Sequence, residues 1–406
     1  MFNLPAGQRH YDGCPRAQIF QTMKKFMFIA SVALGVAALA GCSKEGTKTE
    51  PVSEPEFTGN EVLETVPFTG GTVSYEFETN RAWSVTKSGA TQASAEAYEP
   101  EIAPISGNAG KNTIELTFPA NKTQQEIKFS FTITLDKSAT TKSVDASKAY
   151  TKTVEVTIAA PSVTDAAGNV YKVVYLKDGN FWMAENLRYI PDGQTVSEDP
   201  ANGEIWYPYD FSTLKAVKSD ETIKANGLFY TLEAALGTNL TADNAAKQEK
   251  AQGICPDGWH IPSFEEAYVL FGGTNNIPEG CTITEKPYTN AYYYNADYKG
   301  GNVKEFNEAE PYANLKFVGC VAISGAGIAY QKTIAGFEDY PMTNFWTSTL
   351  YKTVTTETEK FDKVNSQNFV ISLMAVKNSP DGKISMSYGK MKGGNAVRCV
   401  MDQPAN

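Results

Sequence analysis

One stretch near the middle of the chain, residues 254–271, restricts the fold more than any other part of the sequence. Its first half predicts a rigid loop, because Pro256 and Pro262 each fix the backbone angle φ. Its second half predicts a short helix: Ser263 is a suitable N-cap, and Glu266 stands three residues later, as in a capping box. The stretch therefore predicts a structured bend that leads directly into a helix.

The N-terminal part of the chain has the pattern of a bacterial lipoprotein signal. Met23 with two lysines opens a basic segment, and the apolar run 26–40 that follows is shorter than the roughly 20 residues of a membrane-spanning helix. The run ends in Leu-Ala-Gly-Cys, which resembles a lipobox with Cys42 as the lipidated residue; the alternative is an ordinary signal peptide with a chance cysteine. We expect residues 1–41 to be an upstream extension and signal peptide, with translation starting at Met23. The lipid would anchor the protein in the outer membrane, at the cell surface or on the periplasmic face.

The charge balance argues against a nucleic-acid partner. The chain has 46 acidic and 36 basic residues, a formal charge of −10, and removal of residues 1–41 would make the acidic excess larger. A negative surface repels the phosphate backbone of DNA and RNA. The expected partners are therefore the membrane, through the lipid, and an extracellular glycan or protein.

Histidine is too rare for most histidine-dependent chemistry. The chain has two, of which His10 falls in the expected leader, so His260 alone remains. One histidine cannot build a histidine-rich zinc site, and a triad around it is hard to assemble. A dyad of His260 with Cys255 is disfavoured because an extracytoplasmic cysteine is more readily oxidised than nucleophilic. We expect no catalytic residue, no metal and no cofactor, and hence no enzyme.

The cysteines outside the leader suggest two disulfides. Cys255 has a candidate partner in Cys399 near the end of the chain, and this bond would tie the mid-chain loop to the last strand. Cys281 and Cys320 flank the largest insert and are candidates for a second bond, which would close a loop of about 40 residues. The alternative is a buried free thiol at Cys320, because this residue lies in the apolar run 315–323.

Two segments follow the lipidation site. Residues 42–60 consist mostly of Ser, Thr, Lys, Glu and Pro and are expected to form a flexible tether. Residues 61–160 contain short runs with period-two alternation, such as Val73, Tyr75 and Phe77, separated by Gly and Asn. This pattern predicts an all-β, Ig-like sandwich.

This segment resembles the BACON family of Ig-like modules. The residues that carry the resemblance are Gly70-Gly71, Asn80-Arg81-Ala82-Trp83, Ile105-Ser106-Gly107, Gly110, Asn121 and Ala159-Ala160-Pro161. An arginine often found in such modules appears here as Lys128. The resemblance implies a carbohydrate-binding or spacer module. Trp83 fits either a sugar platform or the core, and its alternating strand favours the core, so we expect a spacer.

Residues 161–402 contain six motifs in a fixed order. They are Asp165 with Gly168-Asn169-Val170-Tyr171; Trp182-Met183-Ala184-Glu185-Asn186-Leu187; Cys255-Pro256; Gly258-Trp259-His260 with Pro262; Trp346-Thr347-Ser348; and Val397-Arg398-Cys399-Val400. In this order they resemble the Fibrobacter succinogenes major paralogous (FISUMP) domain. The sequence departs from the pattern of this family at Ala267 and Tyr268 and in the inserts 274–312 and 351–366. We therefore transfer no ligand preference from the family to this chain.

The layout of this domain also resembles the C-type-lectin-like and formylglycine-generating-enzyme-like folds. The resemblance implies an α+β domain whose last strand returns to its beginning, so the whole chain is expected to be multidomain. Trp346 is followed by Thr347-Ser348, without the carboxylate of the calcium-dependent sugar site of lectins. We therefore expect no calcium site.

Aromatic side chains are concentrated in two segments, 205–209 and 288–298. Rings beside Asn and Asp suit stacking on sugars or contact with a protein epitope. The candidate ligand-binding residues are Trp206, Tyr207, Tyr209, Tyr292, Tyr293 and Tyr294. The alternative is that these rings cover the core.

These features together predict a cell-surface lipoprotein with a non-catalytic binding or adhesion head for glycan or protein ligands. The alternative is a structural or accessory part of a surface assembly, such as a fimbrial tip. A polysaccharide hydrolase is the third hypothesis, because an acidic chain always offers candidate carboxylate pairs.

Overall fold

The computed structural model describes residues 54–90, 98–137, 150–271, 302–324, 327–331, 341–352, 361–362, 364–376 and 379–403. The expected leader and the lipidation site at Cys42 lie outside these residues. None of the helices within them is both long enough and apolar enough to cross a membrane.

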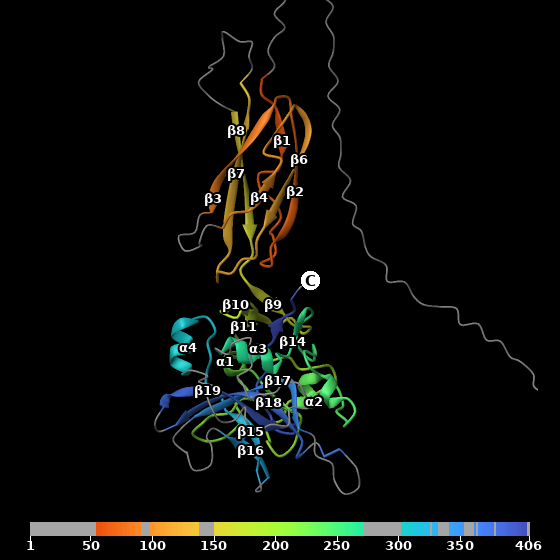
Figure 1. The fold of residues 1–406 in the computed structure, drawn as a ribbon, viewed down its shortest axis with the longest axis vertical. Helices are drawn as coiled ribbons and strands as arrows, with labels where there is room; N and C mark the ends of the chain where they lie inside the picture. Colours follow the sequence, from red (N-terminus) through yellow and green to blue (C-terminus); the bar gives the residue numbers. More distant parts are fainter. Residues whose placement is uncertain are drawn as a thin grey trace, which may run out of the picture. The chain divides into compact units, whose positions relative to one another are not determined.

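The first domain is a sandwich of two four-stranded sheets, ordered β1-β2-β6-β4 and β5-β3-β7-β8 (Figure 1). Its strands are β1 (Phe57–Gly59), β2 (Gly71–Thr79), β3 (Trp83–Ala90), β4 (Glu101–Ala103), β5 (Ser106–Gly107), β6 (Gly110–Phe118), β7 (Ile127–Leu135) and β8 (Tyr150–Ile158). The paired strands are antiparallel, with Tyr75 opposite Ile114 in β2 and β6. The predicted alternation is confirmed, because β2 and β6 bury every second residue along their second halves.

The sandwich begins earlier than expected. Strand β1 lies within the segment 42–60 that we expected to be a tether, because Phe57 pairs with Thr79 and its ring stacks on Phe77 at 5.4 Å. Trp83 is buried and meets Phe77 edge to face at 4.9 Å. Its core position is therefore confirmed, and its ring is not accessible to a sugar.

The second domain contains short helices among several small sheets. Its strands are β9 (Ser162–Thr164), β10 (Val170–Tyr175), β11 (Phe181–Met183), β12 (Ile205–Trp206), β13 (Phe229–Tyr230), β14 (Trp259–His260), β15 (Cys320–Ser324), β16 (Gly327–Gln331), β17 (Met342–Lys352), β18 (Gln367–Val376), β19 (Ser379–Lys390) and β20 (Val400–Met401). Its helices are α1 (Asp220–Asn226), α2 (Leu232–Leu236), the 3-10 turn η1 (Ala245–Lys247), α3 (Phe264–Leu270) and α4 (Val303–Ala309).

The last strand joins the two ends of this domain. In the five-stranded sheet β14-β20-β11-β10-β9, β20 lies between the mid-chain strand β14 and the early strand β11. His260 and Trp182 both pair with Val400. The three-stranded sheet β17-β18-β19 and the hairpins β12-β13 and β15-β16 complete the domain.

Helix α3 begins where the sequence predicts. Ser263 caps it, and the reciprocal bonds of a capping box with Glu266 are both present. The hydroxyl of Thr349 in β17 also accepts a hydrogen bond from the backbone N–H of Phe264 at 2.8 Å. The helix is therefore fixed to the sheet at its N-terminus.

Candidate functional site

The predicted disulfide between Cys255 and Cys399 is present. The S–S distance is 2.10 Å, the Cα atoms are 5.9 Å apart, and both residues are buried. The bond joins the loop before β14 to the residue before β20. The disulfide and the pairing of β14 with β20 therefore hold the same two segments together.

Cys320 has a free, buried thiol, so the structure shows the alternative to the second disulfide. Burial raises the pKa of this thiol to about 12, which keeps it protonated and unreactive. Its candidate partner Cys281 lies outside the described residues.

The motif residues mainly bond to one another and to the backbone. Asp165 accepts hydrogen bonds from the hydroxyl of Tyr171 at 2.6 Å and the side chain of Asn169 at 2.9 Å. The indole of Trp346 donates to the backbone carbonyl of Tyr230 at 2.7 Å, and all these bonds are at least partly buried. These hydrogen bonds of the motif residues therefore stabilise the architecture of the domain.

His260 lies between two carboxylates. Its Nδ1 is 2.5 Å from Asp402, and its Nε2 is 3.1 Å from both oxygens of Glu266, which also accepts from Lys250 at 2.9 Å. Burial lowers the pKa of His260, but the hydrogen bonds and charges of Glu266 and Asp402 outweigh it and the pKa is raised. Burial raises the pKa of Glu266, but His260, the backbone of Ser263 and Lys250 lower it to about 2. These hydrogen bonds hold Asp402 against β14.

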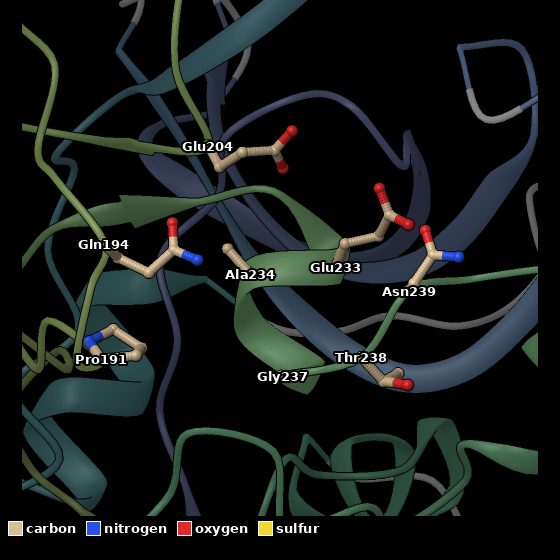
Figure 2. A pocket seen from close by; sticks show the side chains of 8 residues that line it. All are labelled: Pro191, Gln194, Glu204, Glu233, Ala234, Gly237, Thr238 and Asn239. Carbon is tan, nitrogen blue, oxygen red and sulfur yellow. The ribbon is translucent and has the colours of Figure 1, made fainter.

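An open pocket lined by several polar side chains lies beside α2 (Figure 2). Its volume is about 390 Å³, within the range of roughly 300–1,000 Å³ typical of ligand sites. Its lining residues are Pro191, Gln194, Glu204, Glu233, Ala234, Gly237, Thr238 and Asn239. We call it the glutamate pocket. Its polar side chains come from the loop after β11, the residue before β12, helix α2 and the turn after α2.

Helix α2 places the pocket residues by its caps. Thr231 accepts a hydrogen bond from the backbone N–H of Ala234, and Gly237 ends the helix with φ 62°, a left-handed conformation that favours glycine. The turn after Gly237 is held because the N–H of Leu240 donates to Oε1 of Glu233 at 2.8 Å. The two ends of α2 therefore fix the positions of Glu233 and Thr238.

One lysine holds both glutamates of the pocket. Nζ of Lys392 is 2.6 Å from Oε1 of Glu204 and 3.0 Å from Oε2 of Glu233. The hydroxyl of Thr231 donates to the other oxygen of Glu204 at 2.5 Å. Burial lowers the pKa of Lys392, but its bonds and charge interactions with the two glutamates outweigh burial and raise it. The site therefore presents two carboxyl groups with fixed positions beside the amides of Gln194 and Asn239 (Figure 2).

The prediction that Trp206 and Tyr209 bind a ligand is wrong. Their exposed fractions are 1% and 3%. The indole of Trp206 donates to two carbonyls of its own loop at 3.1 Å, and the hydroxyl of Tyr209 donates to the carbonyl of Gln331 at 2.6 Å. Pairing in β12 and packing on Phe229 turn these rings into the core. Tyr207 is half-buried and packs against the core, whereas Tyr292, Tyr293 and Tyr294 lie outside the described residues.

The residues that line the glutamate pocket carry no recognisable signal in the sequence. None of them belongs to the six motifs, and Lys392 and Glu204 are 188 residues apart. The only local signal was Glu233 in the first turn of a short helix, where an acidic residue is common anyway. Within the described residues, no cluster of His, Cys, Asp and Glu side chains is arranged to hold a metal ion.

The sequence profile of the Fibrobacter succinogenes major domain (Fib_succ_major) matches residues 178–401, more than half of the 406 residues. The chain belongs to this family. The match includes the disulfide, the glutamate pocket and five of the six motifs; the motif at Asp165 precedes it. We refer to residues 178–401 as the major domain. No curated protein matches the chain.

Several solved structures resemble parts of the chain at low identity. A PapD-like domain of human CEP192 is 13% identical, with a TM-score of 0.21, over 30% of this chain and 97% of that one. A Bacteroides ovatus GH5 xyloglucanase is 17% identical, with a TM-score of 0.19, over 28% of this chain and 20% of that one. The class 5 fimbriae chaperone CfaA is 9% identical, with a TM-score of 0.21, over 43% of this chain and 82% of that one. At these TM-scores the similarities do not establish a shared fold.

Proposed function

We propose that this protein is a lipoprotein anchored in the outer membrane through Cys42, and that its major domain is a non-catalytic head that binds extracellular glycans. The signal-like pattern that ends at Cys42 supports the anchor. The observation that carries the binding role is the glutamate pocket, with its two carboxylates held by Lys392. In this proposal the sandwich is a spacer of the BACON type, and the major domain has a C-type-lectin-like fold.

The chemistry of the glutamate pocket favours a hydroxyl-rich ligand. Carboxylate oxygens accept hydrogen bonds, whereas the amides of Gln194 and Asn239 and the hydroxyl of Thr238 both donate and accept. Sugar hydroxyls also donate and accept, so they are chemically complementary to these groups. Glu204 and Glu233 carry one negative charge more than Lys392 neutralises, which disfavours a phosphorylated or otherwise anionic ligand.

The same pairing supports a non-catalytic role. Hydrolysis of a glycosidic bond needs one protonated carboxyl as general acid and one ionised carboxylate. In the glutamate pocket a single ammonium group bonds to both Glu204 and Glu233, so the two carboxyl groups have the same charged partner. The arrangement gives the two glutamates the same role rather than opposite ones.

Glycan-array binding by the purified full chain tests the proposal. The wild type should bind a defined set of glycans, and the double variant Gln194→Ala, Asn239→Ala should lose them while its circular dichroism stays unchanged. Gln125→Ala, an exposed amide in the sandwich, is the matched control and should bind as the wild type does. Unchanged binding by the double variant, or a wild type that binds no glycan but co-purifies with a surface fibre, would contradict the proposal.

A further inference from the structure

The tripeptide Ala-Asn-Gly occurs twice in the chain, and both copies lie in the major domain. They are Ala201-Asn202-Gly203 and Ala225-Asn226-Gly227. When glycine follows asparagine, its backbone nitrogen can attack the asparagine side-chain amide readily, because glycine has no side chain to shield that nitrogen. Since the local sequence is the same at both sites, a difference in their reactivity must come from the fold.

The glycine nitrogen of the first copy is accessible. Asn202 and Gly203 are both exposed, and within the described residues no hydrogen bond involves the backbone N–H of Gly203. The side chain of Asn202 donates to Oδ2 of Asp199 at 2.6 Å, but this bond is itself exposed and exchanges with water. Gly203 has φ 125°, which favours glycine, and a Cβ atom there would lie 2.8 Å from Cβ of Ser197. The fold therefore requires a glycine after Asn202 and leaves its N–H unpaired.

The second copy is held in a protected arrangement. Asn226 is the last residue of α1, and the N–H of Gly227 donates to the carbonyl of Ile223 at 2.8 Å. The carbonyl of Asn226 accepts a hydrogen bond from the side chain of Asn186 at 2.8 Å, and Gly227 is buried. The Gly227 nitrogen could attack only after the C-terminal cap of α1 had opened, which costs its hydrogen bond.

We propose that Asn202 is a self-modification site, at which the side-chain amide is lost without an enzyme. Hydroxide removes the proton of the Gly203 N–H, and the nitrogen forms a bond to Cγ of Asn202. The bond between Cγ and Nδ2 breaks, and Nδ2 takes a proton from water and leaves as ammonia, which regenerates the hydroxide. Water then opens the cyclic imide at one of its two carbonyl carbons, which gives aspartate or isoaspartate. The reaction needs no oxidant or reductant.

The reaction would change the backbone that carries Glu204 of the glutamate pocket. The indole of Trp206 donates to the carbonyl of Asn202 at 3.1 Å, and the carbonyl of Glu204 accepts from the N–H of Thr231 at 2.8 Å. Isoaspartate leads the main chain through the side chain of residue 202, which lengthens it and displaces the carbonyl that Trp206 bonds to. Either product also adds a carboxyl group close to Glu204. The modification therefore acts on both the position and the charge of one side of the pocket.

The test is peptide mapping by mass spectrometry of the full chain, incubated in mildly alkaline buffer and sampled over time. In the folded chain, Asn202 should convert at least about tenfold faster than Asn226, a ratio that corresponds to about 1.4 kcal/mol in the activation barrier. In urea, which unfolds both sites, the two should convert at similar rates because their tripeptides are identical. An isoaspartate-specific methyltransferase should label the folded, aged sample at residue 202.

Two variants complete the test. Asn202→Ser should remove most of the ammonia released by the folded chain, whereas Asn226→Ser, the matched control, should leave the release unchanged.

Three results would overturn the proposal. These are no conversion at Asn202 in the folded chain over the time in which the chain in urea converts, equal rates at Asn202 and Asn226 in the folded chain, and a faster rate at Asn226. The mass change and the ammonia release do not involve the ligand of the glutamate pocket, so they test this proposal separately from glycan binding.

Discussion

The guanidinium group of Arg398 donates a hydrogen bond from Nε to Oδ1 of Asn186 over 2.7 Å, although 212 residues separate them. The same guanidinium donates to the backbone carbonyls of Ala313 at 2.5 Å and Asn314 at 2.8 Å. Burial lowers the pKa of Arg398 to about 10, which still leaves the group positively charged at neutral pH. One buried arginine thus joins two family motifs and the loop after α4.

Replacement of Arg398 should therefore destabilise the major domain strongly. Arg398→Met removes three charge-assisted hydrogen bonds and leaves the acceptors unpaired, so the free energy of unfolding should fall by about 3 kcal/mol. Arg398→Lys should recover little of it, because an ammonium group cannot match this planar set of acceptors. Urea unfolding measures the loss. Arg81→Met, at a half-buried site in the sandwich, should cost about 0.5 kcal/mol or less; equal losses at the two sites would contradict this account.

The disulfide should contribute a comparable amount to the free energy of unfolding. Cys255 and Cys399 are 144 residues apart, and a link across so long a loop typically adds about 2–5 kcal/mol by restricting the unfolded chain. The double variant Cys255→Ala, Cys399→Ala should unfold at lower urea concentration than the oxidised wild type. It should also be insensitive to dithiothreitol. Cys320→Ala is the control, and it must keep the full response to the reductant, because Cys320 forms no disulfide.

Local chemistry and long-range contacts differ in how well the sequence predicts them. The helix start at Ser263 and the strand alternation around Tyr75 depend on neighbouring residues, and both were predicted correctly. The disulfide was also predicted, because few cysteines remain to pair once the leader is set aside. The start of the sandwich was missed because β1 has only three residues and is held by β2.

The candidate site could not be predicted in the same way. An aromatic segment shows that rings are present, but whether Trp206 faces solvent or the core depends on strands that are distant in sequence. The glutamate pocket depends on Lys392, which bonds to Glu204 in a loop and to Glu233 in helix α2. No regular spacing in the sequence relates these three residues.

The stability of the major domain should fall as the pH rises through the folded pKa of His260. This pKa is raised in the folded state, so protonated His260 stabilises the fold below the unfolded value of about 6.5, and the contribution is lost above the folded value. Urea unfolding across this pH interval should show the decrease. In His260→Gln the decrease should disappear; a variant with the same slope as the wild type would show that other groups cause it.

The contribution of Glu266 to stability should depend on pH in the opposite direction from that of His260. The pKa of Glu266 is lowered to about 2, so its contribution is present above its unfolded pKa of about 4.3 and is lost as the pH falls towards 2. Glu266→Gln should flatten the stability profile in this interval, because the amide oxygen of glutamine can still accept the bond from the backbone N–H of Ser263 but the side chain no longer titrates. Ser263→Ala is the complementary variant, because it removes the hydroxyl of the cap but keeps the carboxylate beside His260.

Loss of Lys392 should convert the paired glutamates of the glutamate pocket into a repulsive pair. In Lys392→Met, Glu204 and Glu233 lose their common partner, so we expect a loss of about 1 kcal/mol in stability at pH 7 and weaker glycan binding. The stability loss should shrink at pH 4, where carboxylates begin to protonate, and Glu233→Gln added to Lys392→Met should restore part of it at pH 7. Urea unfolding of the single and double variants at the two pH values measures the interaction. If Lys392→Met matches the wild type at pH 7, or if the second substitution restores nothing, the lysine does not hold the two carboxylates in place, and the pocket must be formed by the backbone of α2 and its turn instead.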